Sequence, residues 1–396
     1  MKPELTIVGG TYLELCIEPE SQELYGSGMR AAAALSRNVT QLKFISCVGQ
    51  DYVEVANSVA NAFGFQASFE VIDSTVSFTY YHPLSTPVIY PESALAEEKF
   101  LMQPIKAEAL LVYGQIEAKV FVEGNYVVYD PQNHVPWRET GSKANHLALV
   151  LNSNEAYLLS GLSKSADLES VGKFLLEKEN AEVVIIKNGS KGALSFDKRE
   201  VCSIPLFKTD KVWPIGSGDI FSAAFAWQWM VEKKSAGEAA RIASLCTAYY
   251  CQSRLLPLPL ELPVLQALPA KADGQIVYLA GPFFTIAERW LINELRDKLT
   301  EFGNRVFSPM HDVGPGTPHD VVKPDLDGIT QSSVVLAVAS GLDAGTLFEI
   351  GYARALGKRV VVYAENTTEH DLTMMIGSDC EIVEDFSTAI YQTSWQ

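Results

Sequence analysis

Short apolar runs alternate with helical patterns along most of this 396-residue chain. Runs such as Leu5–Val8 and Val183–Ile186 are the expected strands, and segments such as Asp219–Val231 carry apolar residues at helical spacing. Strands that alternate with helices form parallel βαβ units. We therefore predict an α/β fold whose parallel sheet is covered by helices on both faces. Residues 67–90 alternate without a helix, which predicts a small β lid.

A proline-rich segment divides the chain. Residues 255–274 contain four prolines, which remove backbone donors and disfavour helix. A new strand pattern, Ile276–Ala280, follows at once. We predict a first domain over residues 1–254, a linker over residues 255–274 with the boundary near Asp273, and a second domain over residues 275–396.

The charge of the chain restricts its partners. A formal net charge of −17 repels nucleic-acid phosphates and anionic lipid, so we expect small-molecule substrates and no nucleic-acid polymer. The six cysteines are scattered without a C-x-x-C pair, which is typical of a reducing compartment. No signal-peptide core is present, and no apolar run reaches the ~20 residues of a membrane span. These features predict a cytoplasmic protein with no membrane partner.

The sharpest local motif is Gly216-Ser217-Gly218-Asp219, which opens an apolar helix pattern. Glycines allow successive backbone N–H groups to converge on one anion, and a helix N-terminus adds positive charge there. An aspartate beside such a turn can accept the proton of an attacking hydroxyl while the turn neutralises a transferred phosphoryl group. The alternative is a plain glycine loop in which Asp219 or Ser217 caps the helix.

A second motif places Glu349 near the start of a helix, after the strand pattern Val334–Val338. In the first turn of that helix, the dipole would keep the carboxylate ionised at neutral pH, which suits a nucleophile. The alternative is a capping box, Thr346-x-x-Glu349, in which the glutamate only satisfies a helix N–H. A polar loop nearby matches no strong ligand pattern, so we expect no directly coordinated metal. Its residues are His311, Asp312, His319 and Asp320.

Residues 4–255 resemble the ribokinase (PfkB) family of sugar and nucleoside kinases. Gly216–Asp219 corresponds to the end of the family's D-T-x-G-A-G-D signature, and Val48–Asp51 to its V-G-x-D segment. The resemblance implies that Asp219 is the catalytic base and that ATP and Mg²⁺ are used. It further implies an anion hole of Gly216, Ser217 and Gly218. In the N-x-x-E motif, Asn152 and Glu155 would order magnesium and phosphate through water. In the T-x-G-x-x-G segment, the nucleotide contacts would be Lys187, Asn188, Gly189 and Gly192.

The chain departs from this family pattern mainly where the acceptor binds. The early sugar-binding Asp is Glu14, and the G-G-x-x-x-N segment keeps Gly28 but has Ala32 in place of the Asn. The D-T that opens the terminal signature is Trp213-Pro214. A site stripped of a polar contact discriminates differently among acceptors. Either an acceptor other than a plain sugar binds near Glu14 and Gly28, or the module binds nucleotide without turnover.

Residues 276–385 resemble the nucleoside 2-deoxyribosyltransferase family, a flavodoxin-like α/β fold. The resemblance rests on Tyr278–Phe284, on Asp325-Leu-Asp-Gly-Ile for the family's D-L-N-G-I, and on the D-x-G-x-x-x-E-I-G-x-A signature at Asp343–Ala353. It implies that Glu349 attacks the anomeric carbon, that Tyr278 orients it, and that Asp325 and Asp343 hold the sugar and assist proton transfer. The implied nucleoside contacts are Gly281, Phe283, Gly345 and, from a neighbouring subunit of a homo-oligomer, Met374.

The two resemblances together imply a bifunctional enzyme of nucleoside metabolism. Either a deoxynucleoside is cleaved and the freed sugar phosphorylated, or a nucleoside is phosphorylated and then cleaved. The alternative is a single N-glycosidase, acting on a nucleoside, nucleotide or NAD, that a catalytically silent, nucleotide-binding kinase-like domain regulates. A sister group hydrolyses deoxynucleoside 5′-monophosphates, so transfer and hydrolysis both remain open.

Overall fold

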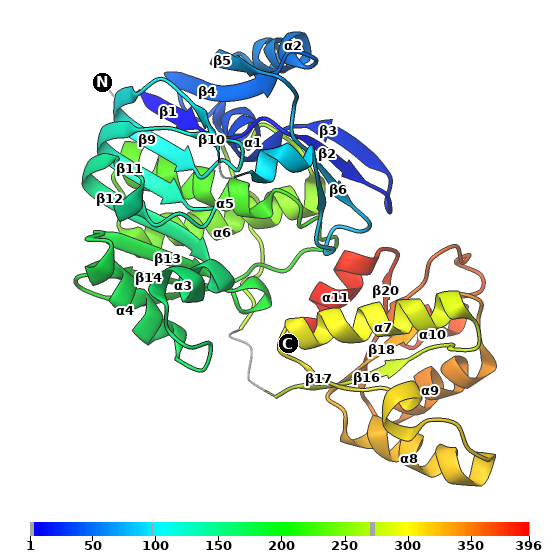
Figure 1. Cartoon of the computed structure of the whole chain (residues 1–396). Helices are drawn as coiled ribbons and strands as arrows, with labels where there is room; N and C mark the ends of the chain where they lie inside the picture. The colour runs from blue at the N-terminus through cyan, green and yellow to red at the C-terminus, as the bar shows by residue number, and fades with distance from the viewer. Residues whose placement is uncertain (1–3, 97, 270–273, 396) are drawn as a thin grey trace. The chain divides into compact units, whose positions relative to one another are not determined.

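The computed structural model describes residues 4–96, 98–269 and 274–395 (Figure 1). The chain divides into two compact units, Met1–Leu268 and Pro269–Gln396, each with its own sheet. The predicted α/β class is confirmed. The predicted boundary at Asp273 lies outside the described residues.

The first unit is built on a nine-stranded sheet in the order β15-β14-β13-β12-β11-β9-β1-β4-β5. Neighbours are parallel except β14, which runs antiparallel to β13 and β15. In sheet order, the strands are Val201–Ile204, Ala193–Asp197, Val183–Lys187, Lys143–Asn152, Val122–Asp130, Ile105–Tyr113, Leu5–Val8, Leu42–Gly49 and Gln66–Ile72.

Helices pack against both faces of this sheet. On one face, apolar residues of four helices share a core with Leu5, Ile7 and Leu111. These helices are α1 (Gly26–Leu35), α2 (Val53–Phe63), α5 (Ser217–Ala226) and α6 (Ala236–Ser253). On the other face, α3 (Ser153–Ser160) and α4 (Leu168–Lys178) share a core with Leu110, Val112 and Val127.

Helices lie on both faces as predicted, but part of that second face lacks a helical cover. Residues 114–121 join β9 to β11, residues 131–142 join β11 to β12, and neither crossover contains an α-helix. Parallel neighbours are usually joined through a helix that covers the sheet. Here the crossovers are too short or too irregular to cover the full length of these strands.

The uncovered half of these three strands is polar, as solvent exposure requires. Lys106 of β9 pairs with Glu123 of β11 at 2.9 Å, and Asn125 donates to Glu108 at 2.6 Å. Side chains on one face of a strand repeat every two residues. On the same face, but nearer the carboxyl ends of the strands, the residues are buried and apolar, as at Leu110 and Val127.

The lid is a separate four-stranded sheet in the order β3-β2-β6-β7. Its strands are Ser21–Leu24, Leu13–Cys16, Ser77–Tyr80 and Val88–Tyr90. Only the later part of residues 67–90 therefore belongs to the lid, because β5 forms an edge of the main sheet. A two-stranded pair, β8 (Phe100–Leu101) and β10 (Ala118–Lys119), lies in the connecting segments.

The proline-rich segment packs on the first unit as far as Leu268. Leu258 is fully buried, and its N–H donates to the Ala34 carbonyl at 2.9 Å. The Lys208 N–H donates to the Gln266 carbonyl at 2.8 Å. Residues 255–268 are therefore a strap across this unit.

The second unit has an all-parallel five-stranded sheet in the order β17-β16-β18-β19-β20. The strands are Arg305–Phe307, Ile276–Ala280, Val334–Val338, Arg359–Tyr363 and Glu381–Val383. The helices are α7 (Ile286–Glu301), α8 (Pro318–Gln331), α9 (Ala344–Ala355), α10 (Thr373–Gly377) and α11 (Phe386–Ser394). Within the described ranges, no helix of either unit has the length and apolarity to cross a bilayer.

Candidate functional sites

The glycine turn of the first unit lies at the N-terminus of α5. Gly216 has a φ of +77°, and a Cβ added there would lie 2.3 Å from Nε of Arg30. Glycine is therefore needed for both the backbone conformation and the space. The Tyr113 hydroxyl donates to the backbone carbonyl of Asp219 at 2.7 Å and so holds the first turn of α5 in place.

The Asp219 carboxylate lies at this turn and is held on both oxygens. Its Oδ2 accepts from Nη1 of Arg30 at 3.0 Å, and its Oδ1 accepts from Nε2 of Gln132 at 2.9 Å. Arg30 is fully buried, and the same Nη1 donates to Oε1 of Glu14 at 3.1 Å. The structure thus joins two predicted site residues, Glu14 and Asp219, through one guanidinium.

Sequence reasoning missed Arg30, although a signal was present. Arg30 is the only charged residue in the run Gly26–Leu35, GSGMRAAAAL. A charge on a buried helix needs a partner of opposite charge, so its isolation pointed to a carboxylate nearby. Gly28, predicted as an acceptor contact, is closely packed: a Cβ there would lie 2.6 Å from Phe44 and 2.7 Å from the Gly9 backbone.

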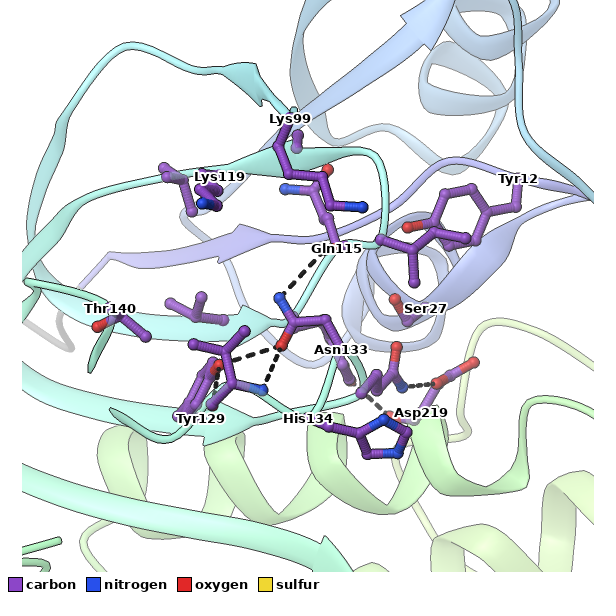
Figure 2. Close-up of a pocket in the computed structure, with 18 of the residues that line it drawn as sticks. Tyr12, Ser27, Lys99, Gln115, Lys119, Tyr129, Asn133, His134, Thr140 and Asp219 are labelled. Atoms are coloured by element: carbon purple, nitrogen blue, oxygen red, sulfur yellow. Dashed lines mark hydrogen bonds between the residues drawn. The ribbon is translucent and has the colours of Figure 1, made fainter. Parts of the chain in front are cut away.

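A cavity of about 940 Å³ lies beside Asp219 (Figure 2). Its lining includes four predicted kinase-site residues, namely Glu14, Gly216, Gly218 and Asp219. In the view of Figure 2, Asp219 and Thr140 lie at opposite sides of the lining, with Asn133 between them. The cavity therefore extends well beyond the carboxylate.

Lys187 stands beside the glycine turn, where the family pattern has a threonine. Its Nζ lies 3.4 Å from the position of a Cβ at Gly218 and 3.1 Å from Oδ2 of Asp130, which also accepts from Ser222 at 2.7 Å. Burial opposes the charge of Lys187, but Asp130 and Glu155 raise the pKa of its ammonium. Asp130 Oδ1 is buried and has no hydrogen-bond partner among the described residues. Lys187 thus places a positive charge next to the turn.

Asn152 and Glu155 form a capping box at the start of α3. The Asn152 N–H donates to Glu155 Oε2 at 2.6 Å, and the Glu155 N–H donates to Asn152 Oδ1 at 2.9 Å. Burial, followed by the charge of Asp130, raises the pKa of Glu155 to about 7. Both residues therefore have a structural role that the sequence pattern alone did not specify.

The predicted nucleotide-contacting residues after Lys187 form a tight turn. The Asn188 N–H donates to the Gly192 carbonyl at 2.7 Å. Gly192 has a φ of +82°, and a Cβ there would lie 2.2 Å from the Ile204 carbonyl oxygen, whereas Gly189 has open space beside it. Among the described residues, no group of three or more His, Cys, Asp or Glu is arranged to hold a metal ion.

The site of the second unit centres on Glu349 of α9. The Tyr278 hydroxyl, from the buried strand β16, donates to Glu349 Oε1 at 2.6 Å. Helix α9 begins at Ala344, so Glu349 lies in its second turn and not in the predicted first turn. The N-cap is Asp343, whose Oδ2 accepts from the Thr346 N–H at 2.9 Å. The proposed capping box of Thr346 and Glu349 is therefore wrong, and Glu349 is free of that role.

Three carboxylates influence one another around Glu349. Burial raises the pKa of Glu349 to about 7, the Tyr278 hydrogen bond opposes the rise, and the charges of Asp325 and Asp343 add to it. Burial therefore opposes the ionised form of Glu349 that we expected the helix dipole to favour. Asp325 lies on α8; burial raises its pKa too, and its Oδ1 is buried without a partner among the described residues.

The remaining predicted contacts of the second unit take different positions. A Cβ at Gly281 would lie 2.7 Å from Ile292, and one at Gly345 would lie 3.1 Å from Asp343 Oδ2, so both glycines allow close packing. Phe283 stacks on Phe284 with ring centroids 5.6 Å apart. Met374 lies on α10 with 82% of its surface exposed, outside the core of its own chain.

Each unit contains a region that matches the model of a known protein family. Residues 121–261 match the family model of the pfkB family carbohydrate kinases, and residues 277–389 match that of the nucleoside 2-deoxyribosyltransferases. No curated protein matches the sequence.

Three similar solved structures each align with about two thirds of the chain. A ribokinase from Thermotoga maritima is 18% identical, with 65% of this chain and 96% of that chain covered and a TM-score of 0.47. A nucleoside kinase from Methanocaldococcus jannaschii is 17% identical, with coverage of 65% and 95% and a TM-score of 0.48. A fructokinase from Vibrio cholerae O395 is 13% identical, with coverage of 64% and 94% and a TM-score of 0.49. The two family matches show that one chain carries a region similar to the pfkB carbohydrate kinases, followed by a region similar to the nucleoside 2-deoxyribosyltransferases.

Proposed function

We propose that the second unit breaks the N-glycosidic bond of a nucleoside through Glu349. The observation that carries the proposal is the 2.6 Å hydrogen bond from Tyr278 to Glu349, since it holds one carboxylate oxygen and leaves the other for attack. The buried Oδ1 of Asp325, which has no hydrogen-bond partner in the described part of the chain, supports a polar ligand at the same place. Because Glu349 does not cap α9, helix capping does not require a glutamate at this position.

The chemistry follows that of a retaining glycosidase. The free Glu349 oxygen attacks the anomeric carbon, the bond from that carbon to the base nitrogen breaks, and a glycosyl ester forms. Asp325 and Asp343 hold the sugar and assist the transfer of a proton from water to the leaving base. A second base or water then attacks the same carbon and releases Glu349. In this proposal, Met374 completes the pocket of a neighbouring subunit, which its exposure permits.

We further propose that the first unit phosphorylates a hydroxyl at the expense of ATP. Support comes from the glycine turn and the Asp219 carboxylate, which line the same cavity. The amides of Gly216, Ser217 and Gly218 and the Lys187 ammonium suit the terminal phosphate of ATP. Mg²⁺ would be held through water by Asn152 and Glu155, and the unpartnered Asp130 Oδ1 could accept from such a water. Asp219 takes the proton of the acceptor hydroxyl as that oxygen bonds to phosphorus and ADP leaves.

One experiment tests both activities. The full chain is incubated with deoxynucleosides, with and without Mg-ATP, and free base and phosphorylated products are identified by mass spectrometry. Base release without ATP supports the Glu349 site, and its absence with every nucleoside contradicts it. Base release without any phosphorylated product favours the alternative in which the kinase-like unit is a silent regulator. Glu301→Gln, a change of the same type in an exposed surface pair with Lys298, is the matched control for Glu349→Gln.

A further inference from the structure

The two crossovers without α-helices shape the far part of the cavity. The lining includes Val120 and Phe121 from the first crossover, and Trp137 and Thr140 from the second. The crossovers also contact each other, since the Val122 N–H donates to Ser142 Oγ at 3.1 Å. The cavity therefore continues from Asp219 into the space that crossover helices would fill. We call this part the crossover subsite and define it by Phe121, Tyr129, Trp137, Thr140 and Ser142. Tyr129 and Thr140 mark its place in Figure 2.

The subsite combines aromatic surface with short polar groups. Phe121, which is 43% exposed, offers an aromatic face to the cavity, whereas the Tyr129 and Trp137 rings are largely buried, with centroids 5.4 Å apart. Hydroxyl and amide groups from Thr140, Ser142 and the neighbouring Asn133 line the same space. Aromatic faces next to hydrogen-bonding edges suit a flat heterocycle with polar atoms on its rim.

The volume of the cavity also favours a ligand larger than a single sugar. Pockets of about 300–1,000 Å³ are typical of ligands larger than one sugar ring, and this cavity measures about 940 Å³. A sugar whose hydroxyl reaches Asp219 would leave the crossover subsite empty. A ligand with a heterocycle attached to that sugar would occupy both parts.

We propose that the acceptor of the first unit is a nucleoside, with its hydroxyl at Asp219 and its base in the crossover subsite. This inference rests on the proposed kinase function and selects its substrate class. A site that holds the base accepts the nucleoside while its glycosidic bond is intact, so both units then act on the same substrate class.

The test measures hydrogen exchange of the full chain by mass spectrometry, in a Glu349→Gln background so that the nucleoside persists. The probes are thymidine, 2′-deoxyadenosine and free 2-deoxyribose. Local exchange separates this site from the second unit, because protection is read at residues 131–142 themselves. We expect at least one nucleoside to slow exchange there, and 2-deoxyribose to leave it unchanged. Equal protection by 2-deoxyribose, or no protection by either nucleoside, overturns the proposal.

Two variants sharpen the result. Val135→Trp enlarges a side chain that lines the cavity and should remove the protection, whereas Lys143→Trp changes an exposed residue outside the lining and should preserve it. Unchanged exchange in β9 and β12 confirms that Val135→Trp still folds, and Val135→Ala, which adds no bulk, should retain binding. Persistent protection in Val135→Trp overturns the subsite. Because exchange needs no phosphoryl transfer, protection without a phosphorylated product contradicts the kinase function and leaves the subsite intact.

Discussion

Nη1 of Arg30 donates to Asp219 at 3.0 Å and so ties the start of the first unit to the turn that carries the proposed base. The two residues are 189 positions apart in the sequence. Since the same nitrogen donates to Glu14 at 3.1 Å, one buried cation balances two carboxylates. The guanidinium thereby sets the position of both carboxylates at the cavity wall.

Removal of Arg30 should destabilise the first unit strongly. Arg30→Met leaves Glu14 and Asp219 close together without a counter-charge, and breaking a buried pair in this way costs about 3–5 kcal/mol. Arg30→Lys keeps the charge but not the fork of donors, and should cost less. Urea unfolding, monitored for the transition of the first unit, gives both values. Equal stability of Arg30→Met and the unaltered chain would show that the ion pairs do not hold this site.

Asp219→Asn should abolish phosphorylation and spare the glycosidic reaction. An amide cannot take the proton of the acceptor hydroxyl, so the rate of phosphoryl transfer should fall at least ~100-fold. Base release from a deoxynucleoside by the same sample is the internal control, because Glu349 is unaltered. Phosphorylation that survives the change assigns the base to another group.

The motifs of both sites could be found from sequence because they are local. The Gly216–Asp219 turn needs a left-handed glycine and a helix start, and both requirements are visible in four residues. The Arg30–Asp219 contact could not be found in this way, because it joins distant segments. Only the isolation of Arg30 in an alanine-rich helix hinted at it.

Local patterns also do not decide two other features, namely which residue caps α9 and whether a helix joins neighbouring strands of the central sheet. At α9, Asp343 and Thr346 both resemble helix caps, and the structure uses Asp343, which moves Glu349 to the second turn. In the central sheet, the strand patterns alone predict β9, β11 and β12. They do not show that the short connections between these strands lack α-helices. The cavity beside Asp219 extends into the space that these missing helices leave.

Glycosidic cleavage should depend on pH through Glu349. Burial raises the pKa of this carboxyl to about 7, so it is mostly protonated below that pH and cannot attack. We expect kcat/KM for base release to rise with pH through about 7 and to level off above it. A profile measured from pH 5 to pH 9, corrected for enzyme stability, checks this. A rate that falls as pH rises through 7 would assign the limiting group to an acid instead.

Tyr278→Phe should move that pH profile upward. The Tyr278 hydroxyl stabilises ionised Glu349 and so lowers its pKa against the effect of burial. Its removal keeps the ring that stacks on Phe307 at 5.5 Å, so the core stays filled. The midpoint of the kcat/KM profile should shift to higher pH, and the rate near pH 7 should drop. A lower rate with an unchanged midpoint would limit Tyr278 to a packing role.

The most direct test of the Glu349 mechanism is intact-protein mass spectrometry of the full chain, rapidly acid-quenched during turnover of a deoxynucleoside. We predict an adduct with the mass of the glycosyl group, mapped by proteolysis to Glu349. Glu349→Gln should lack both the adduct and base release, because an amide does not form the ester. Its stability should stay within ~1 kcal/mol of the unaltered chain, since Glu349 does not cap α9. Base release by Glu349→Gln at a near-normal rate would contradict the account.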